Sequence, residues 1–332
     1  MDHGLLRGSA VVTVLILSEE YDPSVDRVVL ALDDWDVPVV RVDLAWFPQH
    51  LSVDAEFDGT GWNGGLRAPE RYVTFVDLRA VWYRRPTPFT FPGNLTGQRR
   101  AHAEREARFG LGGVLASIPA AWMNHPHRDA EAVYKPRQLA LASRCGLRVP
   151  RTLVTNEPDA VRRFAEATEH GIVTKMLGSN VLVEGGHRYV AHTQGIREAD
   201  LTDLDGVELT AHLFQEWVPK AHEVRVVAVG YELFAVAIHT DDPEAHVDWR
   251  ANYDVLRYAA IDVPDFVAAA IREFLTASGL AFSALDFVVR PDGRWVFLES
   301  NPGGQYGWLH AVWGTAISDA IAAYLAHGGV QR

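Results

Sequence analysis

The segment at residues 282–308, FSALDFVVRPDGRWVFLESNPGGQYGW, constrains the fold of this chain more than any other. Two runs rich in β-forming residues flank the tripeptide PDG at 291–293, which is typical of a tight turn. If the Asp-Gly pair of that turn is a two-residue loop, Asp286 lies directly opposite Glu299, and a bulged turn still leaves them neighbours. The segment therefore predicts a β-hairpin on which two acids face each other.

Opposed carboxylates on this hairpin need a cation, because like charges directly across a sheet are destabilising. Asn301 follows Glu299 by two residues and shares its face if the strand continues. Oxygen ligands suit a hard ion such as Mg²⁺, which commonly also binds phosphate oxygens. The alternative is a hydrated polar face, which the apolar neighbours disfavour (Leu285, Phe287, Phe297 and Leu298). We therefore predict Asp286, Glu299 and Asn301 as metal ligands.

Composition narrows the classes of protein that this chain can belong to. With 332 residues, 48% of them hydrophobic and 22% charged, it can form two or three soluble domains. The chain has a net charge of −12, so it lacks the excess of basic residues that is typical of a nucleic-acid-binding protein. The single cysteine, Cys145, forms no internal disulfide, which suits the cytoplasm. No apolar run approaches the length of a membrane span, so we expect no membrane partner.

Residues 1–124 are predicted as an N-terminal domain. Its opening strand, helix and strand indicate a small open α/β layer, without the GxGxxG of a dinucleotide fold. Residues 51–78 are predicted as hairpins with a turn at Gly64-Gly65. A further strand ends in Arg84-Arg85, which could bind an anion, but such arginines are more often solvated or bridge to the next domain.

Residues 125–208 form a predicted central domain, and 209–332 a C-terminal one. A helix is expected over 127–146, and another over 156–170 with Asn156 as its N-cap. Two lysines have settings that suit phosphate: Lys135 within the first helix, and Lys175 at the end of a strand. The small-residue loop after that strand, with Gly178 and Ser179, can present N–H groups to phosphate oxygens.

A possible nucleotide-base site follows an apolar strand in the third domain. The strand ends with Gln215, Glu216, Trp217 and Val218, where apolar faces and an exposed backbone edge suit adenine. Glu223 is the candidate for the ribose hydroxyls. Each of these features is weak alone, and taken alone this one is better explained as a strand that leaves the core.

The order of the features is more specific than any one of them. Along residues 125–310 the features follow a fixed order. A lysine comes first, then a second lysine with a glycine loop, then an apolar hinge with acids, and last an Asp…Glu-x-Asn pattern. This order resembles that of the ATP-grasp superfamily. The motifs WYRRP at 82–86, HEVRV at 222–226, DWR at 248–250 and ESNPGGQYGW at 299–308 are similar to those of the microviridin-type, or graspetide, ATP-grasp ligases, including their actinobacterial branch. This likeness covers nearly the whole chain.

The resemblance implies a fold, a reaction and partners. The fold is α/β (α+β), an ATP-grasp fold with a pre-ATP-grasp α/β domain, a central lid domain and a C-terminal antiparallel-sheet domain. Such enzymes use ATP and Mg²⁺ to activate Asp or Glu side chains of a ribosomal precursor peptide, leader plus core, as acyl phosphates. A Ser/Thr hydroxyl or Lys amine of the same peptide then closes an ester or amide ring. Arg225 and Arg250 would face the transferred phosphoryl group, and the enzyme would be a homodimer.

Two other functions stay open at this point. One is an ATP-grasp ligase that joins small amino-acid or dipeptide substrates, and the other is a non-catalytic nucleotide sensor. The complete set of predicted metal ligands disfavours the sensor. No dedicated general base is evident, since His222 and His239 are more typical of satisfied or exposed histidines.

Overall fold

The computed structural model describes residues 12–329 apart from 70, 179–180 and 186. Its N-terminal part is built on a parallel four-stranded sheet with the order β2-β1-β6-β7. These strands are Thr13–Ser18 (β1), Val39–Val42 (β2), Leu78–Arg84 (β6) and Ala121–Met123 (β7). β1 is buried along its whole length because it lies between two neighbours, as its run of β-branched and apolar residues predicts.

Helix α1, Pro23–Asp33, connects β1 to β2 and confirms the predicted strand-helix-strand opening. It begins after Asp22, whose carboxylate accepts the N–H of Ser24 at 2.9 Å, and Pro23 occupies the first turn. Val25, Val28 and Leu32 form its buried face. They join a core that reaches into the C-terminal sheet, so the first and last parts of the chain pack together.

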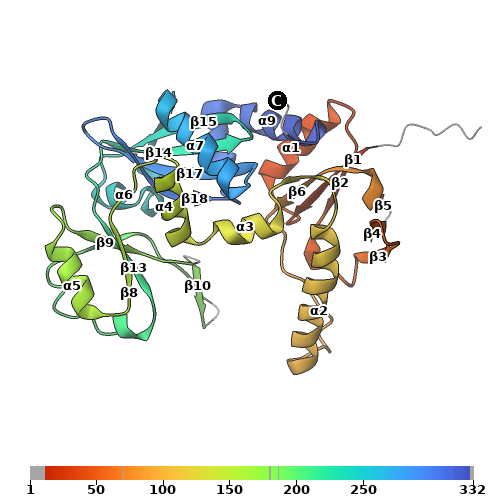
Figure 1. Cartoon of the computed structure of the whole chain (residues 1–332), viewed down its shortest axis with the longest axis horizontal. Coiled ribbons are helices and arrows are strands. Elements are labelled where there is room, and N and C mark those ends of the chain that lie inside the picture. The colour runs from red at the N-terminus through yellow and green to blue at the C-terminus, as the bar shows by residue number, and fades with distance from the viewer. Residues whose placement is uncertain (1–11, 70, 179–180, 186, 330–332) are drawn as a thin grey trace, which may run out of the picture.

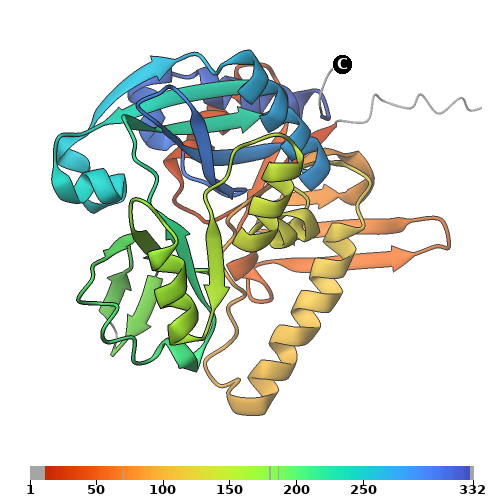
Figure 2. The same ribbon diagram turned by 60° about the vertical axis from the view of Figure 1, so that its left-hand side comes forward.

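An antiparallel meander and a long helix extend from this layer (Figures 1 and 2). They are Ser52–Phe57 (β3), Trp62–Ala68 (β4), Arg71–Thr74 (β5) and Gly97–Ala116 (α2), with 3-10 turns at Leu44–Trp46 (η1) and Phe75–Asp77 (η2). The predicted turn at Gly64-Gly65 is wrong, because both glycines lie within β4. A Cβ on Gly64 would lie 2.0 Å from the carbonyl oxygen of Asp54, so close strand approach requires glycine there.

The predicted helix over 127–146 is two helices, Pro126–Ala132 (α3) and Lys135–Arg144 (α4). A continuous helix would place the ring of Pro136 against the carbonyl of Ala132 and remove a hydrogen bond. The chain therefore leaves the helix at Tyr134, and Pro136 occupies the first turn of α4, where no N–H is needed. This break puts Lys135 at the start of a helix rather than in its middle.

The central part is a smaller lobe around an antiparallel sheet with the order β12-β9-β13-β8 (Figure 1). Its strands are Thr152–Thr155 (β8), Ile172–Lys175 (β9), Gln194–Ile196 (β12) and His212–Glu216 (β13); a separate hairpin consists of Val181–Glu184 (β10) and His187–Val190 (β11). The 3-10 turn Val207–Leu209 (η3) adds Val207 to the small core of this lobe. β12 was not predicted, because three residues at a sheet edge carry almost no periodic signal.

Helix α5, Pro158–Glu166, is shorter than the predicted helix over 156–170. The residue before its first turn is Glu157, so the expected N-cap at Asn156 is wrong. The hydroxyl of Thr155 instead accepts the N–H of Glu157 at 3.0 Å. Pro158 explains the later start, because proline is favoured in the first turn of a helix and restricts the residue before it to an extended conformation.

The C-terminal part contains an antiparallel five-stranded sheet with the order β16-β15-β14-β17-β18. Its strands are His222–Val229 (β14), Glu232–His239 (β15), Arg257–Ile261 (β16), Phe282–Val289 (β17) and Trp295–Asn301 (β18). β16 was not predicted, whereas the other four agree with the sequence prediction within one or two residues. Together the three parts give the predicted α/β arrangement with a C-terminal antiparallel sheet.

Helices pack on the two faces of this sheet to different extents, and the part of one face that no helix covers is where the site lies. Helices α4 and α7, Asp265–Ser278, pack on one face over Val226, Leu285 and Phe297. The other face is covered at one end by α1 and α9, Ala316–Ala326, which lie side by side (Figure 1). The opposite end of that face, which carries Arg225 and Asp286, is left to the central lobe and the loops.

Short helices and turns complete the chain around this end. They are Pro243–Val247 (α6), Trp249–Ala251 (η4), Tyr253–Val255 (η5), Gly307–Leu309 (η6) and His310–Trp313 (α8). Among the residues described, no helix combines the length and the apolar character needed to cross a membrane.

Candidate active site

A cavity of about 650 Å³ lies between the central lobe and the five-stranded sheet, and the N-terminal part closes one side of it. β9 and β13 contribute from the central lobe, and β14, β17 and β18 form the floor. Every predicted site residue within the described chain lines this cavity. Ser179 lies outside the described residues, and Gly178 is at the exposed edge of the cavity.

The acid-bearing hairpin has the predicted pairing but not the predicted turn. The N–H of Arg290 bonds to the carbonyl of Arg294 at 2.9 Å, so the loop has three residues rather than two. The turn-side pairs are therefore offset by one residue, as in Phe287 opposite Phe297. A β-bulge at Leu298 then restores the register, and Asp286 pairs with Glu299 as predicted.

The bulge decides which side chains face the cavity. Phe297 belongs to the helix-covered core, whereas Leu298 and Glu299 both line the cavity. Strict alternation from Phe297 would have placed Glu299 on the helix-covered side. Beyond the bulge alternation resumes, so Asn301 faces the cavity with Glu299. Ser300 points away, and its hydroxyl bonds to that of Ser283 at 2.7 Å, as its position predicts.

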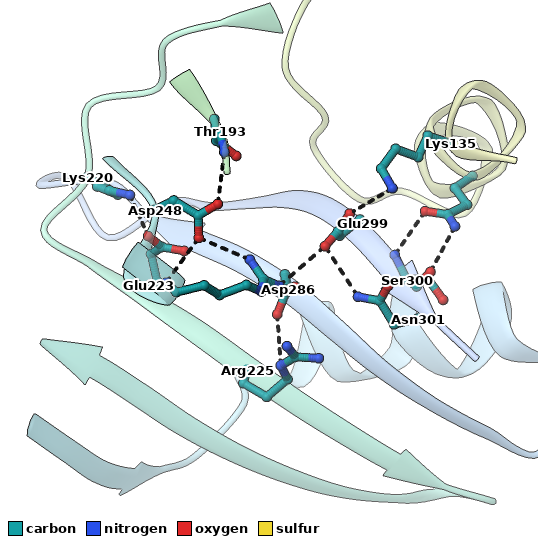
Figure 3. Close-up of polar contacts among 12 residues, drawn as sticks. Lys135, Thr193, Lys220, Glu223, Arg225, Asp248, Asp286, Glu299, Ser300 and Asn301 are labelled. Atoms are coloured by element: carbon teal, nitrogen blue, oxygen red, sulfur yellow. Dashed lines mark hydrogen bonds and ion pairs between the residues drawn. The ribbon is translucent and has the colours of Figure 1, made fainter. Parts of the chain in front are cut away.

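Two arginines neutralise Asp286 (Figure 3). Arg225 Nε lies 2.9 Å from Asp286 Oδ1, and Arg250 Nη2 lies 2.5 Å from Oδ2. The contact with Arg225 is an ion pair without hydrogen-bond geometry, so the buried Oδ1 accepts no hydrogen bond among the residues described. Burial raises the pKa of Asp286, and the charge of Glu299 adds to this, while the two arginines oppose it.

Glu299 has a different set of partners. Its Oε1 lies 3.3 Å from both Arg250 Nη2 and Asn301 Nδ2, and its Oε2 lies 3.3 Å from Lys135 Nζ. Burial alone would raise the pKa of Glu299, but Lys135, Lys175 and Arg250 hold it well below its ordinary range. Burial also lowers the pKa of Lys175, which the charge of Glu299 partly offsets. Both predicted lysines thus converge on one carboxylate.

Arg250 is held by its own short motif. Its Nη1 lies 3.3 Å from Asp248 Oδ1, which also accepts the N–H of Arg250 at 3.1 Å. The other oxygen of Asp248 accepts the N–H of Thr193 from the central lobe at 3.0 Å. The indole of Trp249 has both Arg250 and Arg225 near it, at 4.6 and 5.5 Å from the ring centroid. One tripeptide therefore orients both cations.

The predicted adenine site is at the opposite end of the cavity from the N-terminal part. Gln215 is buried, and its side chain bonds to Thr152 at 3.0 Å, while the Glu216 carboxylate accepts the N–H of Arg151 at 3.0 Å. These side chains brace the strand end. Trp217 and Val218 supply apolar surface there, since both line the cavity. Val218 also packs with the apolar floor from β17 and β18.

Glu223 lines this end of the cavity and is paired with a lysine that the sequence analysis missed. Lys220 Nζ lies 2.5 Å from Glu223 Oε1, and both side chains are buried. Burial raises the pKa of Glu223, and Lys220 opposes that effect. Lys220 also lies over the ring of Trp217, 5.2 Å from its centroid. The position of Lys220, between the apolar hinge and the acid, was the signal that could have identified it.

The two arginines at the end of β6 have different positions. Arg84 is fully buried, lies 3.3 Å from Asp22, and donates to the carbonyls of Gly303 and Gly304 at 2.8 and 3.1 Å. It therefore bridges the N-terminal part to the loop after β18, one of the interpretations left open. Arg85, with φ of 50°, is exposed and lines the cavity.

Two buried amides, also missed in the sequence, fix the hairpin. Gln138 donates to the carbonyl of Ser300 at 2.8 Å and accepts its N–H at 2.9 Å, which ties α4 to β18. Asn124 accepts the N–H groups of Ala281 and Phe282 and donates to the carbonyls of Phe282 and Pro302. Neither amide has a sequence signal, because each acts on a strand more than 150 residues away.

The histidines named as possible bases do not line the cavity. The rings of His222 and His239 lie 4.9 Å apart, and neither is among the residues that line the cavity. Burial and the neighbouring ring lower the pKa of His222. The structure therefore supports the interpretation of this pair as a structural contact.

The side chains at the floor suit a hard divalent cation. Asp286 and Glu299 supply carboxylate oxygens from opposite strands, and Asn301 supplies an amide on the same face. The buried Oδ1 of Asp286 lies 2.9 Å from Arg225 Nε but accepts no hydrogen bond among the described residues, so it keeps lone pairs that a metal ion could use. No group of three His, Cys, Asp or Glu side chains converges within the described residues, so other ligands would come from water or a bound substrate.

Comparisons with known proteins find similar chains. A protein-family model described as the MvdD pre-ATP grasp domain matches residues 13–130. The macrocyclase MdnC from Microcystis aeruginosa MRC, bound with precursor peptide MdnA, is 29% identical, with a TM-score of 0.83 over 95% of this chain and 98% of that one. The macrocyclase MdnB from the same organism is also 29% identical, with a TM-score of 0.78 over 95% and 98%.

A RiPP-associated ATP-grasp ligase from Chryseobacterium gregarium, in complex with ADP and a leader and core peptide, is 27% identical. Its TM-score is 0.89, and the match covers 96% of this chain and 98% of that one. A search of curated protein sequences finds no match. The likeness to these ligases thus extends over the whole architecture.

Proposed function

We propose that this chain, an ATP-grasp ligase of the group that matures ribosomal peptides, forms macrocyclic side-chain ester or amide bonds in a precursor peptide. An Asp or Glu side chain of the peptide would be activated with ATP as an acyl phosphate, and a Ser/Thr hydroxyl or Lys amine would then attack it. The full-length likeness to peptide macrocyclases supports a peptide substrate, and no observation favours the small-molecule alternative.

The observation that carries the proposal is the convergence of four cations on two opposed carboxylates inside one cavity. Lys135 and Arg250 contact Glu299, Arg225 and Arg250 contact Asp286, and Lys175 lies close enough to Glu299 to lower its pKa. A protein gains nothing in stability from such a concentration of buried charge unless a ligand uses it. A triphosphate and a peptide carboxylate are anions that would use it.

The residues suggest a division of roles along the cavity. Trp217 and Val218 would hold the adenine, and Glu223 the ribose hydroxyls, at the end where Lys220 orients that acid. Lys135 and Lys175 would hold the α- and β-phosphates, with Gly178 beside them in the cavity lining. Bound at Asp286, Glu299 and Asn301, Mg²⁺ would neutralise charge on the phosphate oxygens.

Arg225 and Arg250 would act on the reacting groups. The peptide carboxylate attacks the γ-phosphorus, the bond to ADP breaks, and an acyl phosphate forms. Planar guanidinium groups offer several donors to the phosphoryl oxygens and then to the oxyanion formed when the nucleophile attacks the acyl carbon. Both arginines are already oriented by Trp249, which limits the reorganisation required on substrate binding.

We also propose that the enzyme works in the cytoplasm as a homodimer. The need for ATP and the single reduced cysteine, Cys145, support the compartment. The resemblance to the peptide ligases supports the dimer, and light scattering of the purified chain tests it.

The test of the proposed function is incubation with the candidate precursor peptide encoded beside the gene, ATP and Mg²⁺. We expect one water to be lost from the peptide for each ring closed, measured by mass spectrometry, with one ADP released per ring. Asp286→Asn and Glu299→Gln should each lower this rate by at least about 10²-fold, because phosphate charge is no longer offset. Asp292→Asn, in the exposed turn of the same hairpin, is the matched control and should retain the rate. Rings formed at the wild-type rate by the Asp286 and Glu299 variants would refute the metal assignment.

A further inference from the structure

The side chain of Asp129 lies in the cavity on the wall formed by the N-terminal part. It is in the first turn of α3 and is half-buried. Arg85 and the loop from Pro302 to Gln305 also line the cavity, whereas Trp217 and Val218 line it after β13 of the central lobe. A peptide nucleophile that approaches the activated carboxylate from the side opposite the nucleotide would meet this wall.

The other acids of the cavity are already committed to partners. Asp286 and Glu299 are held by arginine and lysine, and Glu223 by Lys220. The remaining two accept backbone N–H groups, Asp248 from Thr193 and Arg250, and Glu216 from Arg151. Among the described residues, Asp129 is the cavity acid that has neither an ion pair nor a backbone donor.

We propose that Asp129 is the base that accepts the proton of the attacking hydroxyl or amine. This inference rests on the proposed function and adds a residue to its second step. As the nucleophile oxygen or nitrogen bonds to the acyl carbon, its proton passes to the carboxylate of Asp129. The carbon–oxygen bond to phosphate breaks, the electron pair leaves with the phosphate, and solvent later removes the proton from Asp129.

The environment of Asp129 suits that role. Burial raises its pKa to about 6, while the amide of Asn124 and the charge of Arg84 act in the opposite direction. A base is most effective when its pKa lies near the working pH, since it is then ionised yet still binds a proton well. Arg84 cannot hold the carboxylate as a full ion pair, because its guanidinium is bonded to Asp22, Gly303 and Gly304.

The polar and titratable groups around Asp129 come from β6 and the residue after it, from the loop after β18, from α3 and from the central lobe. Tyr83 and Arg84 face it from β6, and burial together with the charge of Asp129 raises the pKa of Tyr83. Arg85 lines the same wall after β6, and Gln305 lines it from the loop after β18. His125, His127 and Arg128 are its neighbours on α3. His192 also lines the cavity, from the central lobe, and is the competing candidate for the base.

The two chemical steps can be measured separately in the intact enzyme. Hydroxylamine added to enzyme, precursor peptide, ATP and Mg²⁺ traps an acyl phosphate as a hydroxamate, whereas ring closure is measured as loss of water from the peptide. We expect Asp129→Asn to lower the single-turnover rate of ring closure by about 10²-fold. Hydroxamate formation should stay within about twofold of the wild-type rate, because activation needs no proton acceptor of this kind.

The pH profile gives the second readout. Ring closure by the wild type should fall below about pH 6, where Asp129 becomes protonated. Asp129→Asn should not show this fall in rate at low pH, which we call the acid limb. Asp129→Glu should restore part of the rate. Glu131→Gln removes a half-buried acid on the same helix, paired with Arg137 at 2.6 Å and absent from the cavity lining, and should retain both the rate and its pH dependence. If the acid limb disappears in His192→Gln instead, the base is His192 and the inference is wrong.

The outcomes separate the inference from the proposed function. If the wild type neither forms a hydroxamate nor removes water from the peptide, the proposed function fails. If the wild type closes rings and Asp129→Asn closes them equally fast, or loses trapping and closure in equal measure, only the role of Asp129 is refuted.

Discussion

Asp129 lies outside the charged floor of the cavity, yet it does not behave as an ordinary aspartate. A pKa raised to about 6 means that the folded protein binds this proton more tightly than the unfolded chain does. Its contribution to stability is therefore present at low pH and is lost as the pH rises through 6. An acid kept for catalysis should thus cost stability at the pH where it works.

This cost gives a prediction at the residue scale. Asp129→Asn should raise the free energy of unfolding above that of the wild type by about 1–2 kcal/mol at pH 8, after allowance for partial solvent exposure. The difference should shrink as the pH falls from 6 and vanish near pH 4. Denaturant titrations at the two pH values measure it, with Glu131→Gln as the control that should show no such pH dependence. An Asp129→Asn variant that is less stable than the wild type at pH 8 would contradict the cause assigned to the pKa.

Residue types were the part of the site best predicted from sequence. Asp286, Glu299, Asn301 and the two lysines meet as expected because each sits in a local pattern with its own chemistry. Gln138 and Asp129 were not predicted, since a buried amide or acid within a helix looks like any surface residue until its distant partners are known. Their catalytic and binding roles stay predictions.

At the scale of elements, the hairpin was predicted correctly for a partly wrong reason. Loop length and register are separate variables, and the sequence PDG indicates a turn without deciding between two and three residues. The bulge at Leu298 corrected the offset. The helix boundaries before Pro136 and Pro158 could have been predicted from the known effects of proline on helices. The edge strands β12 and β16 could not, because they lack any strong local pattern.

The turn of this hairpin, at residues 291–293, allows a test of backbone strain. Gly293 has φ of 80°, and a Cβ there would meet no atom within 4 Å, so Gly293→Ala tests backbone strain alone. It should lower the free energy of unfolding by about 1 kcal/mol. Gly110→Ala, in exposed helix α2 with equally open space, should instead raise it by about 0.5–1 kcal/mol. Thermal unfolding of both variants checks the opposite signs, and two changes of the same sign would contradict the account.

At the scale of the molecule, the N-terminal part is joined to the rest through buried polar groups as well as through the shared core. Arg84 links Asp22 to the loop at 303–305, and Asn124 holds the start of β17. The sequence placed Arg84 at a strand end but could not choose between an anion site and a bridge, because the choice depends on a loop more than 200 residues away.

Removal of the Arg84 bridge should lower the free energy of unfolding of the whole molecule. Arg84→Met leaves Asp22 buried without its cation and two loop carbonyls without donors, which should cost about 3–5 kcal/mol of the free energy of unfolding. Arg257→Met breaks an exposed pair with Asp241 and should cost no more than about 1 kcal/mol. Equilibrium unfolding in urea measures both, and equal losses would show that burial of the bridge is unimportant.

The bulge at Leu298 has a consequence for the comparison of related chains. Because Phe287 already faces Phe297 and Asp286 already faces Glu299, Leu298 is the one residue of the strand without a counterpart. A descendant that lost it would have a regular ladder with both acids still opposed. It would lose only the apolar side chain that Leu298 adds beside Val288 and Val218. A one-residue gap at this position in an alignment would therefore mark a change in the apolar surface of the cavity and leave the two opposed acids in place.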